Sequence, residues 1–378
     1  MEQSELNSWA EPLVRTVGVE EEFLLVDRHT RQPVPRASEV LAGAAPLLGD
    51  LVQSEFYSCV VETCTRPTVS LTDLSHQLVE LRSHLAAAAR EEDCLLLGSA
   101  TPIIPPDRPI PVTQKDRYLR MAAHCRAVVD GVEGPTCGCH VHIGTYDKTE
   151  ALALSGHLRP WLPALQALSA NSPFGGGHDS GFASRRTVEF GRWPSAGPPP
   201  LLDRAGYEAA LDDLISTGVV LDRRSLYWYA RPSEHVPTLE IRVADVNADL
   251  HSTVLVAALA RGLCAALLTD LRDSRPAPSV PDSRLRAAHR CAARAGVAGF
   301  LPDPLTGQLV PAHWLVERLL DRAVPGLAAA GDLPMVLSLL ARHFRLGTGA
   351  DRQRACYHRT GRLRDVVDAT ARLTTAAM

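Results

Sequence analysis

The sequence contains no apolar run of 18 or more residues, so it predicts no membrane-spanning helix. It also lacks basic clusters: 39 Lys and Arg residues stand against 43 Asp and Glu residues, for a formal net charge of −4. A nucleic-acid-binding chain would show such clusters, so that class is excluded. The opening stretch, MEQSELNSWAEP, has neither the basic start nor the apolar segment of a signal peptide. We therefore expect a cytoplasmic protein without membrane or nucleic-acid partners.

The two common phosphate-binding loops, G-x-G-x-x-G and G-x-x-x-x-G-K-[ST], are also missing. A disulfide scaffold is not expected, because the nine cysteines are odd in number and the chain is not small. With 378 residues and a 46% share of hydrophobic residues, the chain can build a sizeable core. Any nucleotide site in this core would have to be built without a phosphate loop.

The hydrophobic pattern predicts strands scattered between helices, which is typical of an α+β fold. Strands are expected at 14–26, 51–64, 95–100, 137–144, 225–232 and 238–245. Helices are expected from 71 to 85 with Ser70 as N-cap, over 151–170, over 251–272 and over most of the chain after 283. We expect one catalytic domain over 1–378, with a sheet-bearing core over 1–272 and a mostly helical part over 283–378.

Acidic residues lie inside several of these apolar strands. Side chains alternate between the two faces of a strand, so Glu20 and Glu22 of VGVEEEFLLV share one face and Glu21 takes the other. Glu240 of TLEIRVAD likewise shares a face with Arg242. Such a cluster of carboxylates suits Mg²⁺ or Mn²⁺ better than zinc. The alternative is an exposed edge strand with solvated glutamates.

The second strand leaves a geometric question. Glu62 lies in SCVVETCT, and Glu55 precedes it by seven residues. In an unbroken strand this odd separation would place the two acids on opposite faces. They could face one site only through a bulge or a bend.

The segment CGCHVHIG places His140 and His142 on one strand face and both Cys137 and Cys139 on the other. One extended strand cannot direct all four side chains at a single zinc ion, so a Cys₂His₂ site is disfavoured. Three interpretations of the histidines stay open: a mixed-ligand metal site, a substrate contact, and hydrogen-bonded core residues.

The long loop at 171–200 is rich in Gly, Ser and Pro and carries arginines. Its glycines allow close approach of the backbone, so the loop could bring Arg185, Arg186 or Arg192 over a phosphate as a lid. The alternative is a flexible surface loop whose arginines are solvated.

Taken together, five segments resemble the carboxylate–amine ligase family, also called glutamate–cysteine ligase type 2, which is related to glutamine synthetase. The segments follow the order of the family and span most of the chain: TVGVEEEFLLVD (16–27), CGCHVHIG (137–144), SANSPF…SGFASRRT (169–187), TLEIRVAD (238–245) and GTGADRQR (347–354). The resemblance implies a curved antiparallel sheet that forms a funnel-shaped active site flanked by helices. It also implies ATP and two or three Mg²⁺ ions as cofactors, with Mn²⁺ as a substitute.

The implied reaction is ATP-dependent amide-bond formation through an acyl phosphate, between a small-molecule carboxylate and an amine, as in glutamate–cysteine ligases. Homo-oligomerisation is left open. The resemblance implies a metal shell, with a bend that brings two of its acids, Glu55 and Glu62, together. The implied metal ligands are Glu20, Glu22, Glu55, Glu62, His140 and Glu240.

Other roles follow from the same resemblance. Arg242 is expected at the γ-phosphate, beside Glu240. Substrate contacts are expected at His142, Asn171 and Arg186, with Arg185 as the competing choice for the arginine.

The chain departs from the family where Gly175, Gly176 and Gly177 follow NSPF, at a position usually occupied by an aromatic residue and a glutamine. Two further hypotheses therefore accompany the ligase. One is a zinc-dependent hydrolase that uses His140, His142 and a glutamate. The other is a non-catalytic nucleotide-binding relative. The roles of Glu21 and of GTGADRQR stay open.

Overall fold

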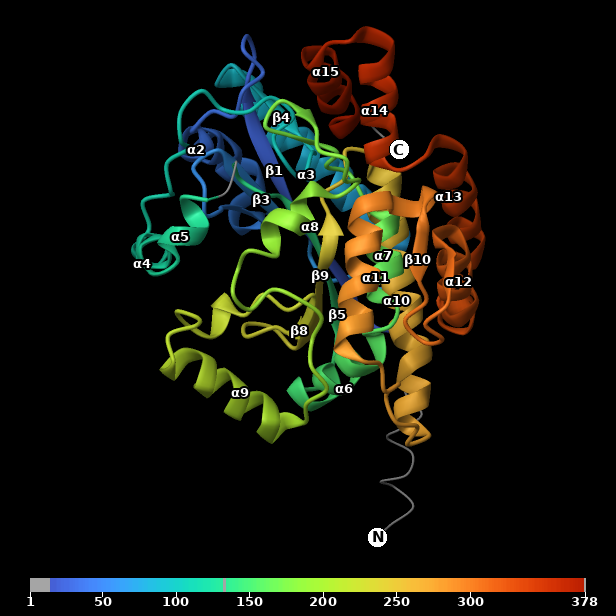
Figure 1. The fold of residues 1–378 in the computed structure, drawn as a ribbon. Coiled ribbons are helices and arrows are strands. Elements are labelled where there is room, and N and C mark those ends of the chain that lie inside the picture. The colour runs from blue at the N-terminus through green and yellow to red at the C-terminus, as the bar shows by residue number, and fades with distance from the viewer. Residues whose placement is uncertain (1–13, 132–133, 377–378) are drawn as a thin grey trace.

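A computed structural model describes residues 14–131 and 134–376 of the chain (Figure 1). The polar opening stretch considered above, MEQSELNSWAEP, lies outside the described residues. The central feature of the fold is an open antiparallel sheet with strand order β2-β3-β1-β5-β9-β8, and β4 pairs with the distal half of β1. Its strands are β1 (Val17–Asp27), β2 (Val52–Ser54), β3 (Val60–Cys64), β4 (Cys94–Leu97), β5 (Gly138–Gly144), β8 (Ala230–Pro232) and β9 (Thr238–Asp245).

Helices flank this sheet, as the α+β prediction requires. In the first half of the chain they are α2 (Ala37–Leu48), α3 (Leu71–Glu91), α4 (Asp116–His124), α5 (Arg126–Val129), α6 (Lys148–Leu158), α7 (Leu162–Leu168) and α8 (Arg185–Phe190). In the second half they are α9 (Arg204–Ser216), α10 (Leu250–Arg272), α11 (Asp282–Ala295), α12 (Ala312–Ala329), α13 (Leu333–Leu346), α14 (Gly349–Thr360) and α15 (Leu363–Thr374). Two short hairpins pair β6 (Phe174–Gly175) with β7 (His178–Asp179) and β10 (Phe300–Pro302) with β11 (Leu309–Pro311).

The two faces of β1 have different surroundings. Val17, Val19, Glu21 and Phe23 are buried, whereas Gly18, Glu20 and Glu22, on the alternate face, are only partly buried. The first set packs against helices, and the largest core cluster joins Val17 and Val19 to residues of α3, α7, α10, α12 and α13. Figure 1 shows the C-terminal helices α12 and α13 beside α10, with α4, α5 and α9 on the other side of the sheet. One sheet face is therefore core, and the other is free to build a site.

Helix α10 passes a test of length and composition for crossing a membrane: it has 23 residues, and its most apolar window has a mean hydropathy of 1.9. The sequence-based expectation rested on the absence of an uninterrupted apolar run of 18 residues. The window is 83% buried inside the protein, and a core helix passes the same test. Within the helix, Arg261 is paired with Asp332 and donates to the carbonyl of Val69 at 2.6 Å.

Several predicted elements are interrupted. The predicted strand 51–64 is two strands joined by a turn, in which the Val60 amide donates to the Tyr57 carbonyl at 2.9 Å. The predicted helix 151–170 divides into α6 and α7 around Pro160, which has no amide proton to continue the first helix. The predicted strand 225–232 pairs as a strand only over Ala230–Pro232, and its start is a short helical turn that Asp222 caps and that ends at Ser225.

The C-terminal part is mostly helical, as expected, and its break around 301–308 is the β10–β11 hairpin. Its helices α12 and α13 share the largest core cluster with the sheet. The single-domain boundaries stay a prediction.

Candidate active site

A cavity of about 560 Å³ opens on the partly buried face of the sheet. Most of the acids predicted from the sequence line it, and arginines and aromatic rings complete its wall. Its acids are Glu20, Glu22, Glu55, Glu62, Glu189, Glu234 and Glu240. Its arginines are Arg117, Arg186, Arg224, Arg231 and Arg242.

The register of the sheet brings the acids of neighbouring strands together. Glu22 of β1 lies opposite Glu62 of β3, and Glu20 lies opposite His140 of β5. His142 of β5 lies in turn opposite Glu240 of β9. Because residues paired across antiparallel strands point to the same face, one row of side chains runs across four strands.

The bend between β2 and β3 answers the question left by the odd spacing of Glu55 and Glu62. Glu55 follows the last residue of β2, and its Oε2 accepts a hydrogen bond from the Phe56 amide at 2.8 Å. Glu62 lies within β3, where its Oε1 accepts from Gln53 and from the Cys64 thiol. Both carboxylates line the cavity because the chain turns between them.

The two histidines of β5 contact a single carboxylate. His140 Nδ1 lies 3.2 Å from Glu20 Oε2, and His142 Nε2 lies 3.2 Å from Glu20 Oε1. The other nitrogen of His142, Nδ1, lies 2.8 Å from Thr238 Oγ1. His140 Nε2 is 3.9 Å from Glu22 Oε1, so His140 lies between the two acids of β1.

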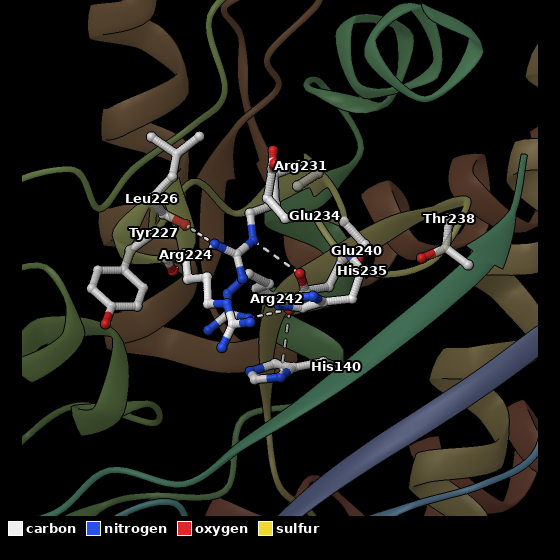
Figure 2. A network of polar contacts seen from close by, with 12 residues as sticks. His140, Arg224, Leu226, Tyr227, Arg231, Glu234, His235, Thr238, Glu240 and Arg242 are labelled. Carbon is white, nitrogen blue, oxygen red and sulfur yellow. Dashed lines mark hydrogen bonds and ion pairs between the residues drawn. The ribbon is translucent and has the colours of Figure 1, made fainter. Parts of the chain in front are cut away.

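Glu240 lies between two arginines, as Figure 2 shows. Arg231 of β8, directly opposite in the register, donates from Nε to Glu240 Oε2 at 2.9 Å. Arg242, two residues along β9, pairs with the other oxygen. The carbonyl oxygens of Arg224 and Leu226 hold the far end of the Arg231 guanidinium. This carboxylate is therefore fixed in position and charge-balanced.

Arg186 reaches the cavity from α8. It is 3% exposed, donates to the carbonyl of Arg242 at 3.2 Å, and lies over the Phe190 ring at 5.0 Å. Its neighbour Arg185 pairs instead with Glu189, at 2.5 Å, and does not line the cavity. A Cβ on Gly138 would lie 2.5 Å from Arg186 Nη2, so glycine is required for this approach.

Burial, reinforced by neighbouring carboxylates, raises the pKa of three carboxyl groups. Burial and the nearby Glu55 raise the pKa of Glu22 to about 7. The pKa of Glu62 is well above its usual value, because burial and then Glu20, Glu55 and Glu22 all disfavour its charge. Burial also raises the pKa of Glu55. Burial and neighbouring carboxylates therefore disfavour the charged forms of the acids on the side formed by β1, β2 and β3.

The groups beside histidine or arginine behave in the opposite way. Burial alone would raise the pKa of Glu20, but hydrogen bonds from His140 and His142 hold it well below its usual range. Arg231 and Arg242 likewise outweigh burial at Glu240 and lower its pKa strongly. Burial lowers the pKa of His140 to about 4, so its imidazole is neutral and can act as a metal ligand near pH 7.

These side chains could hold divalent cations. Three groups have one possible ligand atom per residue, all within 4.8 Å of one another. The groups are Glu22, Glu62 and His140; Glu20, His142 and Glu240; and Glu20, Glu62 and Cys64. Two of the three contain an imidazole, and all contain at least one carboxylate. Oxygen-rich sets of this kind favour hard cations.

The Cys₂His₂ zinc arrangement finds no support in the described chain. Cys137 and Cys139 are fully buried on the face opposite the histidines, and neither belongs to a possible metal group among the described residues. Burial raises the pKa of both thiols well above the usual value.

The structure places Asn171 outside the cavity, so the expected substrate contact needs correction. Its side-chain amide donates to the carbonyls of Gly98 and Val246, each at 2.7 Å, and its Oδ1 accepts from Gln353 at 2.8 Å. The amide group is fully used in joining buried backbone segments. Asn171 therefore holds the start of the 171–200 loop in place.

The segment GTGADRQR, whose role was open, begins a helix and forms ion pairs with two other elements. It begins α14 with a capping box between Thr348 and Asp351. Arg352 pairs with Asp249 at the start of α10, at 2.6 Å. Arg354 forms a two-bond pair with Asp179 of the β6–β7 hairpin, both bonds being 2.8 Å.

The glycine departure lies in that hairpin. Gly176 and Gly177 form its two-residue turn, both with positive φ (57° and 81°), a conformation that glycine adopts without strain. The hairpin does not line the active-site cavity. Of the long loop that we expected to act as a lid, only α8 and the residues that follow it line this cavity.

Sequence reasoning missed part of the wall. Arg231 lies in an ARP stretch whose hairpin register with TLEIR would have paired it with Glu240. An aromatic wall of Phe56, Tyr118, Trp193 and Tyr227 is joined by ring contacts of 5.2–6.0 Å. These rings come from distant segments, and local pattern gives no signal that they meet.

Solved structures share this fold. A bifunctional glutathione synthetase from Pasteurella multocida superposes with a TM-score of 0.71 and 14% identity, over 96% of this chain and 52% of that one. A glutamate–cysteine ligase from Francisella tularensis, solved in complex with AMP, gives a TM-score of 0.70 and 13% identity, over 95% and 88% of the two chains. The fold is therefore that of the glutamate–cysteine ligase structures.

The family follows from sequence comparison. The model of glutamate–cysteine ligase family 2 matches residues 16–369. A protein of Saccharopolyspora erythraea, provisionally named glutamate–cysteine ligase 2-1, is 44% identical over 93% of both chains. A provisionally named glutamate–cysteine ligase 2 of Salinispora tropica is 43% identical, over 92% of this chain and 91% of the relative. The chain belongs to the glutamate–cysteine ligase family 2, which makes it an enzyme of the ligase class.

Proposed function

We propose that the protein is an ATP- and Mg²⁺-dependent carboxylate–amine ligase that forms an amide bond through an acyl phosphate. Glutamate and cysteine, the substrates in the names of its relatives, are the first pair to test. One observation carries the proposal: Glu20, Glu22, Glu55, Glu62 and Glu240 share one cavity with Arg186 and Arg242. Carboxylates in such number repel one another unless cations are bound between them.

The residues fit divalent cations. Burial and then neighbouring carboxylates raise the pKa values of Glu22 and Glu62, and a bound cation would favour their charged forms. The proposed metal ligands are Glu20, Glu22, Glu55, Glu62, His140 and Glu240. When bound, two or three Mg²⁺ ions, or Mn²⁺, would offset the negative charge of the phosphates during phosphoryl transfer.

Arg242 is suited to the γ-phosphate of ATP. Its guanidinium lies in the cavity beside Glu240 and over the Tyr227 ring at 5.8 Å. A fixed cation stabilises the charge that develops on the transferring group. The substrate carboxylate oxygen bonds to the γ-phosphorus as the bond to the ADP oxygen breaks. The chain needs no covalent nucleophile for this step.

Substrate positioning falls to residues around the acids. Arg186, buried and directed into the cavity, suits a substrate carboxylate, and His142 is placed for a second polar contact. In the second step the amine nitrogen bonds to the acyl carbon and gives up a proton, and phosphate leaves with the electrons of the carbon–oxygen bond. The aromatic wall suits the uncharged side chain of a small amine substrate.

The test is an incubation of the purified protein with ATP, Mg²⁺ and pools of amino acids and amines. A coupled assay follows ADP, and mass spectrometry identifies the product. ADP release that requires both a carboxylate and an amine is the expected result. Glu22→Gln and Glu240→Gln should abolish turnover in folded protein, and turnover that survives both changes would refute the metal assignment.

The two other hypotheses predict different results in this assay. A zinc hydrolase that uses His140 and His142 would hold stoichiometric zinc and act without ATP. A non-catalytic relative would bind ATP without releasing ADP. The carboxylate-rich cavity favours the ligase over both.

A further inference from the structure

A second cavity, of about 440 Å³, lies at the far end of β1 from the acids of the active site. It is a groove between the end of β4, the C-terminal half of α3 and α15, and Figure 1 shows α15 close to β4 at this end of the sheet. Four arginines line it, with one acid: Arg28, Arg31, Arg90, Arg372 and Asp368. We call it the arginine groove. None of these residues has a part in the proposed ligase reaction.

Positive charge in the groove is not balanced by its own acid. Asp368 pairs with Arg31, whose Nε lies 2.6 Å from Asp368 Oδ1. Arg28 has only a long contact, 3.9 Å, with the exposed Asp93. Within the described part of the chain, Arg90 and Arg372 form no ion pair. Four guanidinium groups around one cavity, with a single carboxylate, attract an anion.

The shape of the groove is fixed by ordered structure. Arg31 has a φ of +66°, a left-handed conformation that is uncommon for a residue with a side chain. The Asp27 carbonyl accepts from the Arg31 amide at 2.9 Å, and Asp27 Oδ1 accepts from the Thr30 amide at 2.7 Å. The turn after β1 thus directs Arg31 toward α15, where Asp368 holds it.

Part of the lining of the groove is apolar. Leu96 of β4, Ala86 of α3 and Ala371 of α15 line it and are buried. The planar guanidinium group of arginine matches the geometry of phosphate oxygens and binds them through paired hydrogen bonds. A cavity of this size takes a small molecule, and its charge calls for more than one negative group.

We propose that the arginine groove binds a small diphosphate-bearing anion, with Arg31, Arg90 and Arg372 as its ligands. Such a ligand would join α3 to α15 across the groove. Helix α15 is already attached to the sheet at this point, since Thr374 Oγ1 accepts from the Gly98 amide at 2.9 Å. Occupancy should therefore slow amide hydrogen exchange in α15.

Inorganic pyrophosphate is the probe, titrated calorimetrically into the full chain at low ionic strength without Mg²⁺. The test variant is Arg90→Gln with Arg372→Gln. The matched control is Arg345→Gln with Arg359→Gln, which changes the net charge equally at exposed sites outside the groove. We expect at least a tenfold loss of pyrophosphate affinity in the groove variant and unchanged affinity in the control.

The arms of the experiment separate this site from the catalytic cavity. Arg242→Gln should leave pyrophosphate binding and the protection of α15 intact, whatever it does to ligase activity. If the groove variant loses affinity for ADP as it does for pyrophosphate, a nucleotide is a source of the diphosphate. Citrate that binds more tightly than pyrophosphate would overturn the diphosphate assignment. Equal pyrophosphate affinity in the wild type and the groove variant, or no saturable binding at millimolar concentration, would overturn the site.

Discussion

Glu21 and Arg82 form a buried ion pair directly behind the strand face that carries Glu20 and Glu22. Arg82 Nε lies 2.9 Å from Glu21 Oε2, and Thr253 Oγ1 lies 2.9 Å from Glu21 Oε1. The Glu21 side chain is 0% exposed and that of Arg82 is 2% exposed. The same guanidinium donates to the carbonyls of Asn247 and Ala248, both at 2.8 Å. The central glutamate therefore joins β1 to α3 and to the start of α10.

Replacing Glu21 should lower the free energy of unfolding of the protein. Glu21→Gln leaves the Arg82 guanidinium buried without a counter-charge, which costs about 3–5 kcal/mol in the free energy of unfolding. Urea denaturation at pH 7 measures this loss. Glu20→Gln, one residue away on the cavity side, is the control and should lose activity with much less change in stability. Equal stabilities of the two variants would contradict the structural role of Glu21.

Glu62→Gln should stabilise the protein in the absence of divalent cations. Burial and then the nearby carboxylates raise the pKa of Glu62, so a neutral amide at this position removes a charge that the site disfavours. We expect a gain of about 0.5–2 kcal/mol in EDTA, the usual range for one stabilising substitution. Thermal denaturation with EDTA and with Mg²⁺ and ATP measures both states. The variant should lose most of the stabilisation that Mg²⁺ and ATP give the wild type. A variant less stable than the wild type in EDTA would show that Glu62 is not under charge repulsion.

Arg242→Gln should lower kcat by about 10²–10³-fold, the usual cost of removing a fixed group that stabilises transition-state charge. ADP release in the coupled assay measures the effect. Arg224→Gln is the control, because Arg224 also lines the cavity but its side chain is exposed. A similar loss in both variants would indicate a general effect of cavity charge, without a specific role for Arg242.

Gly138→Ala should damage activity more than stability. The added Cβ would lie 2.5 Å from Arg186 Nη2 and 2.9 Å from His140 Nε2, so both side chains must move. Misplacement of positioning groups by about 1 Å can cost 10²-fold in rate. Steady-state kinetics beside urea denaturation measure the two effects. Unchanged kinetics would mean that neither side chain needs its observed position.

Asp249→Asn should destabilise the protein at pH 7 and much less in acid. Burial alone would raise the pKa of Asp249, but hydrogen bonds from Arg352 and Arg342 hold it well below its usual range. A carboxyl group with a lowered folded pKa stabilises the fold above its unfolded pKa, near 3.8, and loses that effect as pH falls toward the folded pKa. We expect a loss of about 1.5–3 kcal/mol at pH 7, typical of hydrogen bonds to a charged group. Urea denaturation at pH 7 and at pH 3 should show the difference between variant and wild type shrinking with acidity.

Alternation along single strands predicted much of the site. It divided Glu20 and Glu22 from Glu21, and it placed His140 with His142 and Glu240 with Arg242, as the register confirms. The resemblance added the bend at Glu55, which alternation alone could not decide. The family and the fold expected from that resemblance are confirmed, whereas the metal and substrate roles of these residues stay predictions.

Long-range packing set the limit of sequence reasoning. Asn171 lies next to a loop that reaches the cavity, but its amide is used by Gly98, Val246 and Gln353. No local pattern reveals those partners, because they come from segments far apart in the chain. Arg82, on a helix whose apolar face was correctly predicted, gave no sign that it would neutralise Glu21.

The two-sided character of β1 restricts how this stretch can change over evolutionary time. A single-residue insertion or deletion before Glu20 would exchange the faces of the strand. Cavity carboxylates would then enter the apolar interior, and the partner of Arg82 would enter the cavity. This segment can therefore change by substitution but not by insertion or deletion. The length of the segment is as constrained as its composition.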